Sequence, residues 1–282
     1  MKNITLALFC VFAVLVGNAQ IKTPQASPNA KIEQTVGLTE ITVAYSRPSM
    51  KGREIFGDLV PYDKIWRTGA NENTVISFSE DIMFGGTKVS KGSYAIITKP
   101  GKKSWEMYLY AETTNWGAPR NFDMSKVVAK ATAEVFEVPF QVETFTIDFN
   151  NLTNNGADLE LLWSNVYVAF PIETLTKEQT MASIDKVMQG PSARDYYSAA
   201  VYYYAEDMEL AKAVEMIDKA IAMDGDNAAF WMYRQQSLIH DKAGDRKGAI
   251  KAAKTSLKKA KEAGNADYVK MNEDTLREWK AL

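Results

Sequence analysis

The sequence predicts a two-domain protein, an antiparallel all-β sandwich followed by an all-α stack of antiparallel helical hairpins. Between residues 30 and 171, apolar and polar residues alternate, as in strands that bury one face. Over residues 172–282 the apolar period becomes helical. With 282 residues, of which 46% are hydrophobic and 24% charged, the chain is long enough for two folded domains and is not typical of a disordered protein.

Residues 1–19 are typical of a secretory signal peptide. Lys2 gives the start a positive charge, residues 4–16 form an apolar run, and Ala19 is a small residue suited to cleavage. The apolar run is shorter than the roughly 18 residues needed to span a bilayer. We therefore expect cleavage near Ala19, a linker over residues 20–29, and export to the periplasm or the cell exterior, with no transmembrane segment in the mature chain.

Cysteine and histidine are scarce in this sequence. Cys10 is the single cysteine and lies in the predicted signal peptide, while His240 is the single histidine. A Ser-His-Asp triad, a multi-histidine metal site or a zinc–thiolate cluster therefore has too few residues, and we expect no metal or cofactor. The formal net charge of −2 does not favour a nucleic-acid partner.

The β half, residues 30–171, is expected to hold roughly eight to ten strands. The alternation is clearest in the segments centred on Val43, Met107 and Ile147. Turn residues at 85–86, 100–101 and 154–156 predict tight connections between strands. A sandwich is favoured, and a partly open barrel is the second choice.

Six helices are predicted after a domain boundary near Pro171. Their expected ranges are 177–188, 193–204, 210–223, 228–242, 246–263 and 267–280. The connections between them are short and several contain glycine, so neighbouring helices are expected to be antiparallel.

Two segments of the helical half resemble tetratricopeptide repeats. Residues 207–225 are similar to the second helix of a repeat, with glycine where proline is usual, and residues 244–249 are similar to the turn inside a second copy. The copies are degenerate, since Ser256 stands where alanine is usual. His240 is expected to pack as an aromatic residue does.

The resemblance to these repeats implies a partner-binding surface. The first helix of each repeat lines the concave side of such a stack, which would present Tyr202, Trp231 and Arg234 to a peptide or a partner domain. The alternative is that the β domain or the flanking helices fill this surface.

Three long motifs lie in the β half. They are QTVGLTEITVAYSRPSMKGREIFG at 34–57, LVPYDKIWRTGANENTVISFS at 59–79 and KGSYAIITKPGKKSWEMYLY at 91–110. Together they resemble a family found in exported proteins of Bacteroidetes-type bacteria, domain-of-unknown-function family 2911. The C-terminal helices also look like those that often follow this domain. The resemblance implies an exported β domain but no reaction and no catalytic residue.

Polar and aromatic residues gather in two loops between predicted strands. The candidate ligand-binding residues are Arg47, Lys51, Arg53, Trp66, Arg67, Asn71 and Glu72. Arginines can hold a carboxylate or phosphate with paired hydrogen bonds, and a tryptophan offers an apolar face to a sugar ring. A structural interpretation competes with this one: the arginines would bond carbonyls at strand ends, Trp66 would join the core, and Gly69 would serve the backbone.

These observations favour an exported, non-enzymatic binding or interaction protein. Its β domain would hold a small polar or saccharide ligand, and its helical domain would bind an unknown protein or envelope component. One alternative is a carboxylate-based hydrolase of envelope glycans, for which Glu72 and Asp63 are the catalytic candidates. A purely structural envelope module is the other alternative.

Five lysines recur at helical spacing near the C-terminus and form a basic stripe. They are Lys247, Lys251, Lys254, Lys258 and Lys261. A solvated helix face is the ordinary interpretation of such a stripe. The alternative is that it contacts an acidic component of the envelope.

Overall fold

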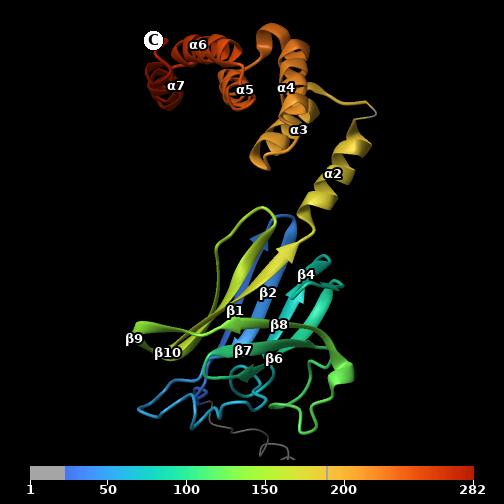
Figure 1. Cartoon of the computed structure of the whole chain (residues 1–282), viewed down its shortest axis with the longest axis vertical. Coiled ribbons are helices and arrows are strands. Elements are labelled where there is room, and N and C mark those ends of the chain that lie inside the picture. The colour runs from blue at the N-terminus through green and yellow to red at the C-terminus, as the bar shows by residue number, and fades with distance from the viewer. Residues whose placement is uncertain (1–22, 189) are drawn as a thin grey trace, which may run out of the picture. The chain divides into compact units, whose positions relative to one another are not determined.

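A computed structural model describes residues 23–188 and 190–282 (Figure 1). The predicted signal peptide lies outside the described residues. The chain divides into two compact units, of which the first ends at Lys177 and the second begins at Glu178. The boundary thus falls after Pro171, because the last strand continues through this residue. Pro171 comes just before the ladder that begins at Ile172, where no proline N–H is needed.

The first unit contains ten strands among its described residues. They are β1 (Asn29–Val36), β2 (Thr39–Ser46), β3 (Val75–Phe78), β4 (Ile82–Phe84), β5 (Thr87–Val89), β6 (Gly92–Pro100), β7 (Ser104–Tyr110), β8 (Val127–Glu134), β9 (Phe136–Asn150) and β10 (Gly156–Thr174). One sheet has the order β1-β2-β3-β6-β7-β8 and the other β5-β4-β10-β9. The paired strands are antiparallel, which confirms the predicted all-β class of this half.

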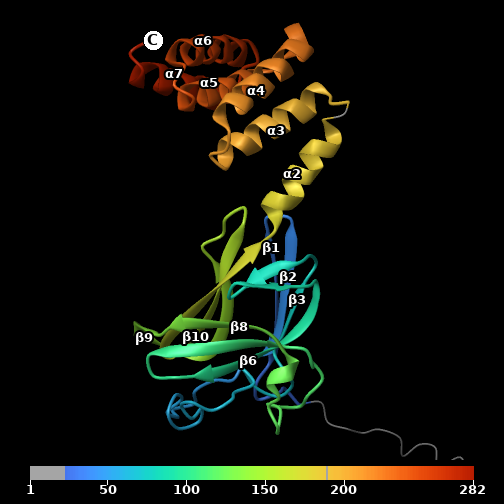
Figure 2. The same ribbon diagram turned by 45° about the vertical axis from the view of Figure 1, so that its right-hand side comes forward.

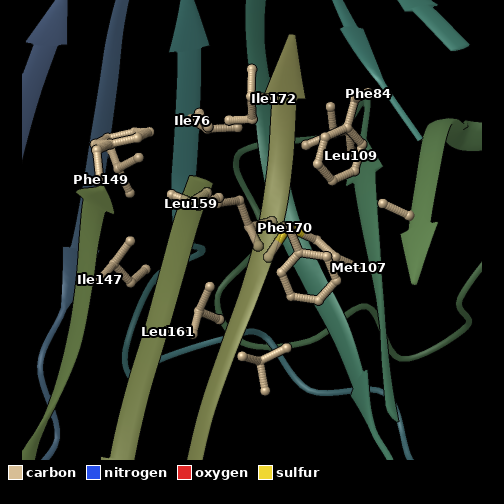
Figure 3. Close-up of a cluster of buried hydrophobic side chains, with 14 of the residues drawn as sticks. Ile76, Phe84, Met107, Leu109, Ile147, Phe149, Leu159, Leu161, Phe170 and Ile172 are labelled. Atoms are coloured by element: carbon tan, nitrogen blue, oxygen red, sulfur yellow. The ribbon is translucent and has the colours of Figure 1, made fainter. Parts of the chain in front are cut away.

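The core of the first unit lies between the two sheets. In Figure 3, Met107 and Leu109 of β7 lie near Phe170 of β10, with Phe84 of β4 beside them. The alternate residues of β2, β7 and β9 that the sequence assigns to one face are buried, as predicted. Burying each such large apolar side chain contributes about 1.5–3 kcal/mol before entropy is counted.

The β4–β5 hairpin turns at Gly85 and Gly86, where the sequence predicts a tight connection. Both glycines have positive φ, +56° and +76°. A side chain at Gly85 would overlap the carbonyl oxygen of Lys130 on β8, whereas a side chain at Gly86 would meet open space. Gly85 therefore meets two requirements, a left-handed conformation and a close approach to the other sheet.

β10 changes partners along its length. Its first part pairs with β9, and its last three residues, Ile172–Thr174, pair with β4. The β9 pairing shifts register on both sides of Ser164, which adopts a positive φ of 57°. A residue left out of the ladder in this way bends the strand. The bend positions the candidate site described below.

Six α-helices follow. They are α2 (Thr176–Val187), α3 (Ala193–Ala205), α4 (Leu210–Asp224), α5 (Phe230–Lys242), α6 (Arg246–Glu262) and α7 (Ala266–Glu278). Each predicted range is confirmed to within two residues. Side-chain caps explain several of the starts: Ser192 and Asp195 form a capping box at α3, while Asp245 and Asn265 accept backbone N–H bonds at α6 and α7.

From α3 to α7, consecutive helices of the second unit pack on one another (Figure 2). Ala213, Ile217 and Ala220 of α4 are buried, as the periodicity predicts. Ser256 on α6 is also buried; it donates to the Phe230 carbonyl at 2.7 Å and accepts from the Asn272 amide at 2.9 Å. The Ser256 hydroxyl thus satisfies two buried polar groups, which the alanine usual at this repeat position could not do. None of the helices described is long and apolar enough to cross a bilayer.

Candidate functional site

Arg47 and Arg53 hydrogen-bond to groups within the first unit. Arg47 donates from Nε to the Phe145 carbonyl at 3.0 Å and from Nη2 to Thr146 Oγ1 at 2.7 Å. Arg53 donates to the carbonyls of Met50 at 2.9 Å and Ser49 at 2.7 Å. Arg47 thus fastens the loop after β2 to β9, and Arg53 stabilises a turn within that loop. Both arginines bond to the protein itself, as the structural interpretation predicts.

Trp66 packs into the core cluster. Its ring stacks on Trp163 at 6.0 Å with 16° between the planes, and it makes edge contacts with Phe56 and Trp105. Nearby, Gly69 has φ +146°, and a side chain there would come within 3.0 Å of the Ser46 carbonyl oxygen. Trp66 therefore does not present a free face to a sugar. Glycine at position 69 allows the positive φ and the close approach of the Ser46 carbonyl.

Arg67, Asn71 and Glu72 differ from one another in their surroundings. Arg67 is half-buried, burial lowers its pKa, and its buried Nε has no hydrogen-bond partner among the described residues. Asn71 donates to Ser46 Oγ at 3.3 Å. Glu72 is exposed and lines a hollow of about 390 Å³ over β1 and β2, of which neither Arg47 nor Arg67 is a lining residue.

Lys51 and Asp63 are both exposed and both occupy turn positions with positive φ, 51° and 58°. The Lys51 backbone N–H donates to Glu143 Oε1 at 2.9 Å, and the Asp63 backbone N–H donates to the Pro100 carbonyl at 2.8 Å. The predicted residues of the two loops therefore do not line one common pocket.

A second cavity lies where the β9–β10 ladder is interrupted. We call it the bulge cavity; its volume is about 400 Å³. Its lining residues are Met50, Glu54, Ile55, Phe56, Tyr62, Gly101, Lys102, Trp105, Val135, Glu137, Gln141, Ser164, Asn165 and Val166. They come from the loop after β2, the β6–β7 turn and the bent part of β9 and β10, so the fold rather than any one segment builds the cavity.

The bulge cavity combines an aromatic base with a polar rim. Phe56 and Trp105 are 8% and 2% exposed and belong to the core cluster. On the rim, the Ser164 hydroxyl donates to Gln141 Oε1 at 3.1 Å, and the Lys102 ammonium lies 5.5 Å from the centre of the Tyr62 ring. Apolar surface with a few polar groups around it is typical of small-ligand sites.

Two carboxylates, Glu54 and Glu137, line the same cavity. Neither makes an ion pair within the described part of the chain. They can therefore accept hydrogen bonds from hydroxyl or amino groups of a ligand. Among the described residues, no group of three or more His, Cys, Asp or Glu side chains is arranged to hold a metal ion.

Sequence reasoning missed the β9 and β10 contributions to this cavity. Gln141, Ser164 and Asn165 are about 100 positions from the candidate loops, and only strand pairing brings them close. One local signal existed. Ser164 and Asn165 interrupt the apolar stretch from Leu161 to Phe170, and two such turn-forming residues inside a strand indicate a bulge.

The three partner candidates of the second unit lie at separate places. Tyr202 lines a hollow of about 170 Å³ between α2 and α3. Trp231, 40% exposed, lines another of about 550 Å³ and meets Tyr197 edge-on at 4.9 Å. Arg234 instead donates to Thr275 Oγ1 of α7 at 2.9 Å. Only Trp231 retains a large exposed aromatic surface.

His240 is a hydrogen-bonded residue rather than a simple packing aromatic. Its Nδ1 lies 2.8 Å from Asp245 Oδ2 and its Nε2 lies 2.9 Å from Asp218 Oδ1. Burial opposes the charged form, but the bonds to Asp218 and Asp245 outweigh it, so the pKa of His240 is raised above 6.5. Because carboxylates only accept, both ring nitrogens donate when the imidazole is protonated.

Comparison with known proteins adds a family but no activity. No curated protein and no solved structure is significantly similar to the chain. The model of the family described as protein of unknown function (DUF2911) matches residues 27–172, which include nine of the ten strands in full and β10 as far as Ile172. This match spans just over half of the chain, and the protein therefore belongs to the DUF2911 family.

Proposed function

We propose that this chain is an exported, non-enzymatic binding protein. Its β unit would hold a small polar ligand, with saccharides as the class that fits best, and its helical unit would bind a protein partner. The signal-like residues 1–19 support export, with cleavage near Ala19 and a final location in the periplasm or outside the cell.

The bulge cavity carries the ligand-binding part of this proposal. Its buried aromatic base suits the apolar face of a sugar ring, and its rim of carboxylate, amide and hydroxyl groups suits the ring hydroxyls. The carboxylates Glu54 and Glu137 outnumber the single cation Lys102, so a neutral sugar or an amino sugar fits better than an acidic one.

The helical part of the proposal rests on Trp231. The tetratricopeptide-like interpretation of α4 to α6 supports a protein partner, and Trp231 is an exposed aromatic residue beside a hollow. Tryptophans that become buried when a partner binds often contribute much of the binding free energy. Trp231→Ala is therefore the variant with which to test capture of a partner.

Isothermal titration against neutral, amino and acidic sugars and envelope glycan fragments tests the ligand site. For a sugar that binds, we expect Glu54→Gln and Gln141→Ala to weaken binding at least about tenfold, since the first removes a charged hydrogen-bond acceptor and the second removes an amide from the cavity. Glu72→Gln is the matched control because Glu72 lines the separate hollow over β1 and β2.

Two results would contradict this location. Loss of binding in Glu72→Gln with retention in Glu54→Gln would move the site to the other hollow. Binding that survives both cavity substitutions would remove the bulge cavity from the proposal. Cooperative melting of each variant shows that the unit remains folded.

A carboxylate-based hydrolase of envelope glycans is the second candidate, and the observation that favours it is that Glu54 and Glu137 line one cavity. Glycoside hydrolysis needs two such groups, one as acid and one as base or nucleophile. Turnover of a glycan fragment that disappears in both Glu54→Gln and Glu137→Gln would establish the enzyme. Glu72 and Asp63, the catalytic candidates from sequence, do not line this cavity.

A purely structural envelope module is the third candidate. The internal hydrogen bonds of Arg47 and Arg53 favour it, because these arginines then serve the fold alone. Absence of binding and turnover across the whole glycan panel, in a chain that melts cooperatively, supports this candidate.

A further inference from the structure

Helix α6 carries the densest charge of the second unit. Its sequence, RKGAIKAAKTSLKKAKE, holds seven basic residues and one acidic residue, whereas the whole chain has a net charge of −2. Five of the basic residues form what we call the lysine face. They are Lys247, Lys251, Lys254, Lys258 and Lys261.

The lysine face points to solvent along the helix. Its residues are spaced alternately by four and three, which at about 100° per residue places them within an arc of about 80°. All five are exposed. The buried side of α6 is made of small residues, Ala249, Ala252, Ala253, Ser256 and Ala260, on the opposite side of the helix.

Little of this charge is neutralised. Among the described residues, Lys247, Lys251 and Lys254 make no ion pair. The Lys258–Glu262 pair is 3.9 Å long between side chains that are 79% and 61% exposed, and such a pair contributes little. Only Lys261 has a close partner, Glu273 at 3.0 Å.

An apolar hollow borders the lysine face. Its volume is about 380 Å³, and Leu257, Leu276 and Leu282 line it together with Lys254, Lys258 and Lys261. The Leu282 side chain is 62% exposed. Cationic groups next to accessible apolar side chains complement a surface that is anionic outside and apolar beneath.

We propose that the lysine face binds the anionic surface of a lipid bilayer. The face spans about 21 Å of helix and contains lysine alone. Lysine is a compact point charge suited to a diffuse layer of headgroups, whereas paired recognition of defined carboxylates on a protein favours arginine. The adjoining Leu257 and Leu282 would contact the apolar region below the headgroups. This surface is separate from the bulge cavity and from Trp231, so the proposal stands independently of the proposed function.

Vesicle flotation tests this binding, with a chain lacking residues 1–19 so that the apolar run at 4–16 does not contribute. The vesicles are phosphatidylcholine alone or with about 30% phosphatidylglycerol. We expect binding to the anionic vesicles only, weakening steeply with salt. The variant Lys251→Glu/Lys254→Glu/Lys258→Glu should lose at least about 100-fold in affinity, since each lysine near an anionic surface contributes about fivefold.

A matched variant controls for net charge. Lys64→Glu/Lys91→Glu/Lys177→Glu makes the same charge change at exposed lysines of the first unit and should bind as the unaltered chain does. A triple lysine-to-arginine variant of residues 251, 254 and 258 should also keep binding. Equal binding to neutral vesicles, or equal losses in the two glutamate variants, would overturn the proposal. So would retention on immobilised polyglutamate without vesicle binding, which would assign the face to an acidic protein.

Discussion

At the scale of single residues, His240 shows how a lone titratable group links three helices. It lies on α5, and its two carboxylate partners are Asp218 on α4 and Asp245 at the start of α6. Asp245 also accepts from the Gly248 N–H at 2.9 Å, and this bond, with His240, lowers the pKa of Asp245. A side chain at Gly248 would collide with the side chains of His240 and Asp245 and would displace them.

This arrangement predicts a stability that declines with rising pH. The folded pKa of His240 is raised above 6.5, so its contribution is complete below 6.5 and is lost as pH rises through the folded value. We expect a loss of roughly 1–2 kcal/mol, the size of a charged hydrogen bond. Urea unfolding of the helices, followed by circular dichroism from about pH 5 to about pH 9, measures it.

His240→Gln is the control for this effect. Glutamine does not titrate, so the variant should be less stable at low pH and should lack the decline. A decline of equal size in the variant would assign the pH dependence to a group other than His240.

The candidate ligand residues were only partly predictable at this scale. Arg47, Trp66 and Gly69 behave as the structural interpretation states, because strand ends need donors, large aromatic rings find the core, and crowded turns need glycine. The sequence offered both interpretations of these residues. Arg47 donates to the Phe145 carbonyl on β9, about 100 positions away, and the local sequence around Arg47 does not specify this partner.

At the scale of elements, the β4–β5 hairpin gives a sharp test of packing. Gly85→Ala introduces both a positive-φ penalty and a collision with the Lys130 carbonyl of β8, while Gly86→Ala introduces only the first. We expect about 1 kcal/mol of destabilisation for Gly86→Ala and at least about 3 kcal/mol for Gly85→Ala. Chemical unfolding followed by tryptophan fluorescence compares them. Equal effects would show that the hairpin moves away from β8 at no cost.

Element positions were largely predictable, and their bends were not. Helix ends follow caps and glycines, which are local, and strands β2, β7 and β9 follow alternation, which is also local. The partner change along β10 is different. It depends on which strand β10 meets after Ser164, and the alternation of apolar residues does not specify a partner.

At the scale of the whole molecule, the two units have separate cores. The first is centred on residues such as Trp105, Trp163 and Phe170, and the second on Tyr203, Ile217 and Ile239. We expect two unfolding transitions in urea, one seen mainly by tryptophan fluorescence, because four of the six tryptophans lie in the first unit, and one by helical circular dichroism. Gly85→Ala should shift only the first and His240→Gln only the second. Coincident shifts of both signals would show that the units unfold as one.

The sequence by itself determined the two fold classes, the helix ranges, the family and the basic stripe. These properties depend on local periodicity, caps and composition, which neighbouring residues carry. Only the tertiary structure decided where a ligand could bind. The bulge cavity is built from the loop after β2, the β6–β7 turn and a strand irregularity, and these meet only after both sheets have formed. The sequence likewise predicted His240 only as a packing residue. Its hydrogen bonds to two carboxylates could not be predicted, because those carboxylates come from two other helices.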